Sequence, residues 1–249
     1  MPLIQHLLEL RKRLVRAVLG VVLGGVVGWF LNDLVLNALR SPLIGSEGKS
    51  RTQSALNFPG ITSAFDVKFE IAIVLGVVLS SPVWLYQIFA FVTPAFTRGE
   101  KKYVFGFFFT AVPLFLAGCA AGWLLVPHIV ALMTGFAGQQ DTTLVDAKIY
   151  LDFVLRLVLI IGVAFVLPVF LVLLNFLGVL RAKAILKGWR LAILVTIVFT
   201  ALATPSADVL SMLLLAAPLI ALYFGSVGIA MLHDRRADRR AQAAVAAAL

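Results

Sequence analysis

Charged residues are scarce in this chain of 249 residues, and their scarcity excludes an ordinary soluble domain. Only 13% of the residues are Asp, Glu, Lys or Arg, whereas soluble domains have about 25%. The chain has one cysteine, Cys119, so one chain by itself can form neither a disulfide nor a thiolate metal cluster. The three histidines lie in separate segments and do not form a metal-binding pattern: His6, His128 and His233.

Catalytic signatures are also missing from the sequence. There is no G-x-S-x-G elbow, no H-E-x-x-H pair, no P-loop and no dinucleotide fingerprint. No polar dyad suits an intramembrane hydrolase, so neither an enzyme nor a cofactor is expected. Among the apolar segments, charges occur only near the expected external ends, at Glu70, Asp152 and Arg156. The last two are spaced i, i+4 and should pair, and the uncharged segment centres argue against a proton-relay pump.

Apolar residues make up 61% of the chain and are gathered in long runs. A bilayer core about 30 Å thick needs roughly 20 apolar residues per helix. The pattern predicts a single all-α, polytopic membrane domain over residues 1–249, with six transmembrane helices in a curved, concave bundle. Prolines inside the second, third, fourth and sixth spans should kink them. The spans are expected near residues 14–36, 69–92, 103–132, 149–178, 189–204 and 209–232.

The segments between and around these spans have distinct patterns. Residues 1–13 have leucines at helical spacing and interleaved charges, which predicts a short interfacial helix that turns into the first span. Residues 37–68 contain Pro and Gly and are expected to form an external loop that packs back onto the bundle. The fifth span is about 21 Å long, so local membrane thinning is expected around it. Residues 233–249 form a predicted cytoplasmic tail.

The distribution of Lys and Arg predicts that both termini are cytoplasmic. Of the 21 basic residues, 15 fall on one side together with four acids, which leaves six basic and eight acidic residues for the other side. Anionic membrane lipid explains these juxtamembrane clusters, and nucleic-acid binding is not expected. The basic clusters on the cytoplasmic side are Arg11 to Arg16, Arg98 to Lys102, Arg181 to Arg190 and Arg235 to Arg240.

Two of these cytoplasmic segments each contain one carboxylate among several cations. Residues 6–14 read HLLELRKRL and contain Glu9, and residues 84–102 read WLYQIFAFVTPAFTRGEKK and contain Glu100. The two acids could receive a cationic partner. They could equally be solvated interfacial charges that form weak i, i+4 pairs, and the residues alone leave both interpretations open.

These two segments resemble the TatC family, the six-span, signal-reading core of the twin-arginine protein translocase. Other similar segments occur in family order across almost the whole length, and several segments in order are more specific than any one of them. They are S-P-L at 41–43, Y-L-D-F-V at 150–154, F-V-L-P-V at 165–169, T-P-S-A-D at 204–208 and A-A-P-L at 216–219.

The resemblance implies a signal-peptide receptor in a bacterial or archaeal cytoplasmic (inner) membrane. It implies export of folded proteins with an Arg-Arg signal peptide, driven by the proton-motive force. The implied partners are TatA/TatB-type single-span subunits, membrane lipids and further copies of the chain in a larger complex. By the family pattern, Glu9 and Glu100 receive the arginine pair. The same pattern associates Arg11, Arg13, Phe91 and Pro94 with that surface, and Pro42 with a sensitive external loop.

Three positions depart from the family pattern where it usually has polar residues associated with partner docking. The fourth span has Val166 in place of a usual Glu, and the sixth has Met212 and Phe224 in place of a usual Gln and Glu. We expect partner contact along the fifth and sixth spans to rely on apolar packing. Two alternatives remain, a six-span small-solute transporter or channel and a structural scaffold with lipid-bound basic faces. A transporter would need polar groups near the midplane, and few are present.

Overall fold

The computed structural model describes residues 3–44, 56–57, 60, 62–92, 101–135, 145–203 and 209–248. These residues form an all-α fold with one small addition, a two-residue parallel pairing of Leu56 with Val145 and Asn57 with Asp146. The expected all-α class is therefore confirmed. The helices are α1 (Leu3–Phe30), α2 (Asn32–Ile44), α3 (Ser63–Leu79), α4 (Ser81–Val92), α5 (Lys101–Gly135), α6 (Ala147–Phe176), α7 (Ala182–Lys187), α8 (Trp189–Ala203) and α9 (Val209–Ala248), with strands β1 (Leu56–Asn57) and β2 (Val145–Asp146).

The first helix is longer at its N-terminal end than the sequence pattern predicts. Instead of an interfacial helix that ends near residue 13, α1 runs unbroken over Leu3–Phe30. The predicted turn is therefore wrong within the described residues. The physical reason is that the segment around residues 10–16, LRKRLVR, has good helix formers and no Gly or Pro to end the helix.

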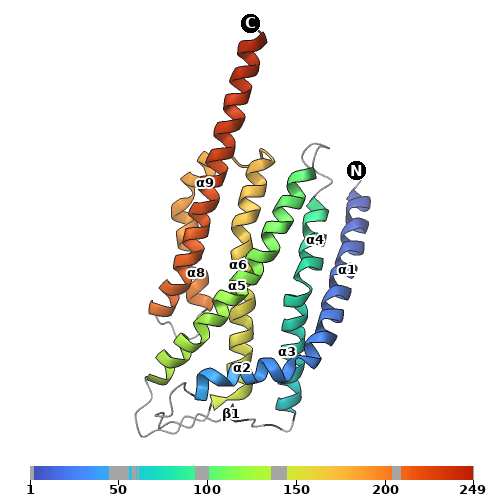
Figure 1. The fold of residues 1–249 in the computed structure, drawn as a ribbon, viewed down its shortest axis with the longest axis vertical. Helices are drawn as coiled ribbons and strands as arrows, with labels where there is room; N and C mark the ends of the chain where they lie inside the picture. Colours follow the sequence, from blue (N-terminus) through green and yellow to red (C-terminus); the bar gives the residue numbers. More distant parts are fainter. Residues whose placement is uncertain are drawn as a thin grey trace.

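The break comes later, at Leu31, where α1 ends and α2 begins. The part of the expected external loop at residues 37–44 is therefore helical, and α2 crosses the end of the bundle opposite the N-terminus (Figure 1). Two hydrogen bonds hold it there. Asn32 Nδ2 donates to the Lys68 carbonyl at 2.9 Å, and the Tyr150 hydroxyl donates to the Leu39 carbonyl at 3.1 Å.

The second predicted span is a bent pair of helices. α3 and α4 meet at an angle of 54°, next to Pro82, whose ring cannot continue the hydrogen-bond ladder. The Trp84 indole N–H donates to the Val77 carbonyl at 2.9 Å. That bond satisfies one of the carbonyls that the end of α3 leaves without an intrahelical donor. The kink expected from this proline is confirmed.

Glycines allow the helices to approach at backbone distance in two places. A Cβ added to Gly24 of α1 would lie 2.7 Å from the Gly76 carbonyl oxygen of α3. One added to Gly118 of α5 would lie 2.9 Å from the Cα of Gly162 in α6. Close small-residue contacts of this kind are the usual means of helix association in lipid, where there is no hydrophobic drive between helices. The main buried cluster contains residues from each of the five helices α2, α3, α4, α5 and α6, with Ile71, Phe115 and Leu151 among its most buried members.

Several helices are long and apolar enough to cross a membrane. Among the described residues, four qualify alone, the bent α3–α4 pair makes a fifth, and α8 is a shorter apolar helix over Trp189–Leu202. A short apolar helix is present where the fifth span is expected, and its crossing of the membrane, like the count of six crossings, stays a prediction. The four are Leu7–Phe30, Phe105–Val130, Ala147–Phe176 and Leu215–Arg239.

The described residues of the basic clusters gather at one end of the bundle, called here the basic end. It is formed by the first half of α1, the end of α4, the start of α5, all of α7 and the part of α9 after Leu232 (Figure 1). The opposite end carries α2, the start of α3 and the start of α6. α9 continues as a helix well past residue 232, through most of the predicted tail. This gathering of basic residues at one end matches the charge asymmetry of the sequence, which predicts that the basic end is cytoplasmic.

Replacing Gly24 with alanine should loosen the α1–α3 contact. We expect Gly24→Ala to lower the free energy of unfolding by about 1–3 kcal/mol, the usual cost of overpacking, and to lower the thermal midpoint in detergent. Gly228→Ala is the matched control, because a Cβ there meets nothing within 4 Å. Alanine is also the better helix former, so this control should be neutral or stabilising. If the two variants have the same thermal unfolding midpoint, the close contact between α1 and α3 does not limit the stability of the protein.

Candidate functional site

Glu9 lies on α1 at the basic end and already holds a guanidinium. Arg13 Nε and Nη2 donate to the same Glu9 oxygen, Oε1, at 3.1 and 2.6 Å. The Glu9 side chain is 28% exposed and that of Arg13 is 20% exposed, so the pair is partly shielded from water. The i, i+4 pair that was one of the two interpretations of Glu9 therefore exists, and it shows that this carboxylate accommodates an arginine.

The other residues expected on this surface are only partly described. Arg11 is exposed on α1, and Phe91 is half-buried at the end of α4. α4 packs against α1, so these two positions belong to neighbouring helices at the basic end. Glu100 and Pro94 lie outside the described residues, and so does the side chain of Pro42, whose backbone lies on α2.

The three positions expected to contact partner subunits differ in accessibility. Val166 is 4% exposed and packs in the main buried cluster with Val169 and Leu173 of the same helix. Phe224 is 43% exposed on α9, and Met212, near the start of that helix, is half-buried. A partner helix could touch Phe224 and Met212 directly but could reach Val166 only if the core repacked. The structure therefore favours α9 over Val166 as the place of contact.

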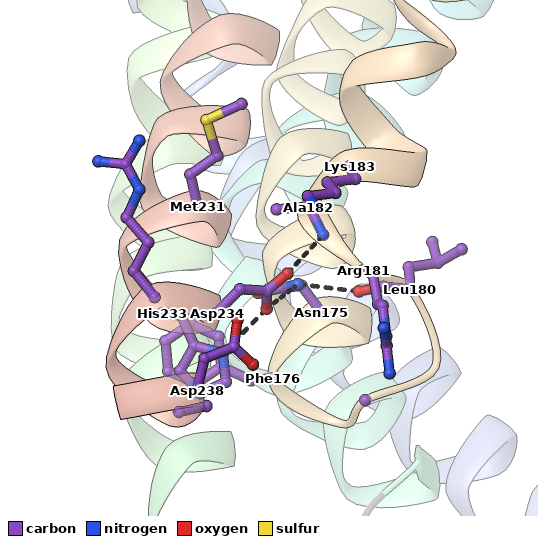
Figure 2. Close-up of a pocket in the computed structure, with 13 residues that line it drawn as sticks. Asn175, Phe176, Leu180, Arg181, Ala182, Lys183, Met231, His233, Asp234 and Asp238 are labelled. Carbon is purple, nitrogen blue, oxygen red and sulfur yellow. Dashed lines mark hydrogen bonds and ion pairs between the residues drawn. The ribbon is translucent and has the colours of Figure 1, made fainter. Parts of the chain in front are cut away.

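A polar cluster that the sequence did not predict links the end of α6 to α9. Asn175 Nδ2 donates to Asp234 Oδ1 at 2.9 Å and to the Leu180 carbonyl at 2.8 Å, and the Ala182 N–H donates to Asp234 Oδ2 at 2.8 Å (Figure 2). Asn175 is 2% exposed. Its only local signal was a polar residue inside an apolar run, whereas its partner lies 59 positions away.

The turn after α6 explains why this cluster forms. Gly178 has φ 71°, its N–H donates to the Asn175 carbonyl, and the Val179 N–H donates to the Leu174 carbonyl. This is the Schellman pattern that ends a helix at a left-handed glycine. It turns the chain back so that the start of α7 faces Asp234. The carboxylate accepts the first N–H of α7, a donor that has no partner within the helix.

Beside this cluster lies a cavity of about 470 Å³ between the end of α6, α7 and α9. The His233 imidazole stacks on the Phe176 ring, with ring centroids 3.9 Å apart. Cations and carboxylates both line the cavity, so it has no single charge preference. Its charged lining residues are Arg181, Lys183, Arg235, Asp234 and Asp238.

Charges at the opposite end form ion pairs. Arg156 Nε lies 2.6 Å from Asp152 Oδ1, which confirms the pair expected from their spacing. Lys148 Nζ lies 2.9 Å from Asp66 Oδ2 and joins α6 to α3. Asp146 caps α6 by accepting hydrogen bonds from the Lys148 and Ile149 N–H groups. Within the parts of the chain that the structure describes, no group of three or more His, Cys, Asp or Glu residues could hold a metal ion.

Known proteins resemble this chain over nearly its whole length. A family model described as Sec-independent protein translocase protein (TatC) matches residues 5–218. The protein of that name in Xylanimonas cellulosilytica is 47% identical, covering 99% of this chain and 89% of the relative. The Rothia mucilaginosa protein of the same name is 35% identical, covering 96% and 82%. A crystal structure of a twin-arginine translocase receptor, TatC, in the detergent DDM has a TM-score of 0.79 and 27% identity, covering 90% of this chain and 99% of that one.

Removing the Asp234 carboxylate should release α7. We expect Asp234→Ala to cost about 1–3 kcal/mol of stability, because it leaves the Ala182 N–H without an acceptor and removes one of the two acceptors of the buried Asn175 amide. Amide hydrogen exchange in residues 177–188 should rise. Asp238→Ala is the control, since that carboxylate is exposed on the same helix. Unchanged exchange in the Asp234 variant would mean that the apolar contacts of α7 hold it without the anchor.

Proposed function

This chain belongs to the TatC family of Sec-independent protein translocase proteins, and we propose that it binds twin-arginine signal peptides at its basic end. It is a multi-pass membrane protein with a transport role. With single-span partner subunits it exports folded proteins across the cytoplasmic membrane, driven by the proton-motive force. Family membership favours this function over the small-solute transporter and the scaffold.

The observation that carries this proposal is the guanidinium bound to Glu9. A signal-peptide arginine makes the same kind of contact, so its binding exchanges one guanidinium for another or adds a second to the same carboxylate. The planar guanidinium fork fits a carboxylate better than a lysine ammonium does. Lys12 and Arg16 stand on the same helix and repel cations in general, so selectivity depends on this geometry. Glu100, in the connection between α4 and α5, is proposed as the second acceptor.

Removing the charge of Glu9 should weaken binding of an Arg-Arg signal peptide. A hydrogen bond to a charged group contributes about 1.5–3 kcal/mol, so Glu9→Gln should raise the dissociation constant roughly 10- to 100-fold. The measurement is binding of a labelled peptide to the purified chain in detergent. A Lys-Lys peptide should bind the native chain weakly and respond less to the substitution.

Asp238→Asn is the matched control for this experiment. It removes one carboxylate from the same end of the molecule but on α9, away from α1. If both variants lose the same affinity, the effect of Glu9 is one of overall charge and the proposed site is wrong. If the Lys-Lys peptide binds the native chain as tightly as the Arg-Arg peptide, selectivity for guanidinium is excluded.

We also propose that the partner subunits contact the exposed apolar face of α9. Phe224 and Leu213 are exposed and lie about three turns apart on one face of the helix, in keeping with the apolar residues that replace the usual polar ones. Contact by packing alone is a normal mode of helix association in lipid.

Single-cysteine crosslinking can test this contact. In a Cys119→Ala background, which removes the only cysteine of the chain, we expect Phe224→Cys to crosslink to a cysteine in the partner helix. Val166→Cys should not crosslink, because the position is buried. Phe109→Cys, on an exposed position of α5, is the control for random encounter. Crosslinking from position 166 but not from 224 would contradict contact along α9.

A further inference from the structure

An apolar groove lies on the membrane side of α7. Its volume is about 560 Å³, and its walls come from α6, α7, α8 and α9. Leu167, Leu191 and Val195 are exposed along it, so the groove is open to the surroundings, which at this depth are lipid. Leu180, Ala184 and Gly188 line it at the level of α7.

Two cations, Lys187 and Arg190, stand beside this groove and form its basic rim, whereas Arg181 and Lys183 line the neighbouring cavity. Lys187 and Arg190 are the immediate chain neighbours of Gly188 and Leu191, which line the groove. Both cations are exposed, and no ion pair involves them within the described part of the chain. The Arg190 guanidinium lies 5.6 Å from the centroid of the Trp189 ring, an arrangement suited to the membrane interface.

The nearby carboxylates do not neutralise the rim. Asp234 is turned inward and accepts hydrogen bonds from Asn175 and Ala182 (Figure 2). Asp238 is exposed on α9 and lines the neighbouring cavity rather than the groove. The rim therefore keeps most of its positive charge.

The rim is also held in place without a ligand. The Tyr223 hydroxyl donates to the Ile185 carbonyl and Asn175 donates to the Leu180 carbonyl. Ala182 and Ile185 are buried against α9 in a separate apolar cluster. A ligand that binds here meets a preformed site and does not have to order α7, which lowers the cost of binding.

We propose that this groove and its rim bind one anionic phospholipid, with an acyl chain in the groove and the phosphate at Lys187 and Arg190. Basic pockets between membrane helices on the cytoplasmic side are typical sites for anionic headgroups. Charge complementarity selects this occupant over a zwitterionic lipid, and the groove leads from the charged rim directly into an apolar channel. The site lies on α6–α9, away from Glu9, so it is independent of signal-peptide binding.

The test is native mass spectrometry of the full chain with phosphatidylglycerol, and with phosphatidylcholine of the same acyl chains. Each basic residue near an anionic surface contributes roughly a fivefold change in affinity, so Lys187→Gln/Arg190→Gln should bind phosphatidylglycerol about 25-fold more weakly. Lys12→Gln/Arg16→Gln is the matched control, since it removes two cations from α1 at the same end. Ala192→Phe fills the groove without changing charge and should also weaken binding.

The expected result is one retained phosphatidylglycerol per native chain, lost selectively in the rim and groove variants. Inorganic phosphate at millimolar concentration should not displace it, because the acyl chain contributes to binding. The proposal is overturned if phosphatidylcholine is retained equally, if the α1 control loses the lipid to the same extent as the rim variant, or if phosphate alone displaces it. Thermal unfolding of each variant verifies that it is folded, and the rim variant decides the matter even if Ala192→Phe does not fold.

Discussion

Backbone contact between helices is the constraint on which the rest of this structure depends. Gly24 meets Gly76 and Gly118 meets Gly162 at distances that leave no room for a Cβ. In lipid the helices gain nothing from leaving water, so close packing of this kind provides much of the association. The first contact fixes α1 against α3, and the second fixes α5 against α6. Together they place the start of α1 and the end of α4 at one end of the bundle.

Polar groups then connect the helices at the two ends of the bundle. At the basic end, a glycine turn after α6 brings α7 to Asp234 on α9, and Asn175 ties the turn to the same carboxylate. At the opposite end, Tyr150 and Asn32 hold α2 across the helix ends. The Ala182 N–H is a donor that the start of α7 leaves without a partner within the helix. Asn32 and Tyr150 instead donate to carbonyls inside α3 and α2. All these bonds give buried polar groups a partner where helices meet.

In the proposed function, the same cations serve both orientation and recognition. Concentration of Lys and Arg at one end favours retention of that end in the cytoplasm, the side on which the proposed signal-peptide and lipid sites lie. A single carboxylate among these cations points to a binding role, because most of the neighbouring charges repel the cation that the carboxylate accepts. Glu9 is satisfied by Arg13 in the absence of a ligand. The basic rim of the groove, Lys187 and Arg190, has no such internal ion-pair partner among the described residues, which makes it suited to an external anion.

The sequence by itself determined the all-α membrane class, the positions of the apolar segments to within several residues, the short apolar helix near residues 189–203 and the gathering of positive charge. These follow from local hydropathy and charge, which any stretch of chain carries with it. Only the tertiary structure decided that α1 continues unbroken past residue 13, that residues 37–44 are helical and that Val166 is buried. It alone revealed the pairing of Asn175 with Asp234 across 59 positions. Such features depend on which helices face one another. A periodic apolar pattern indicates that a segment avoids water, but it does not show whether a side chain faces lipid or another helix.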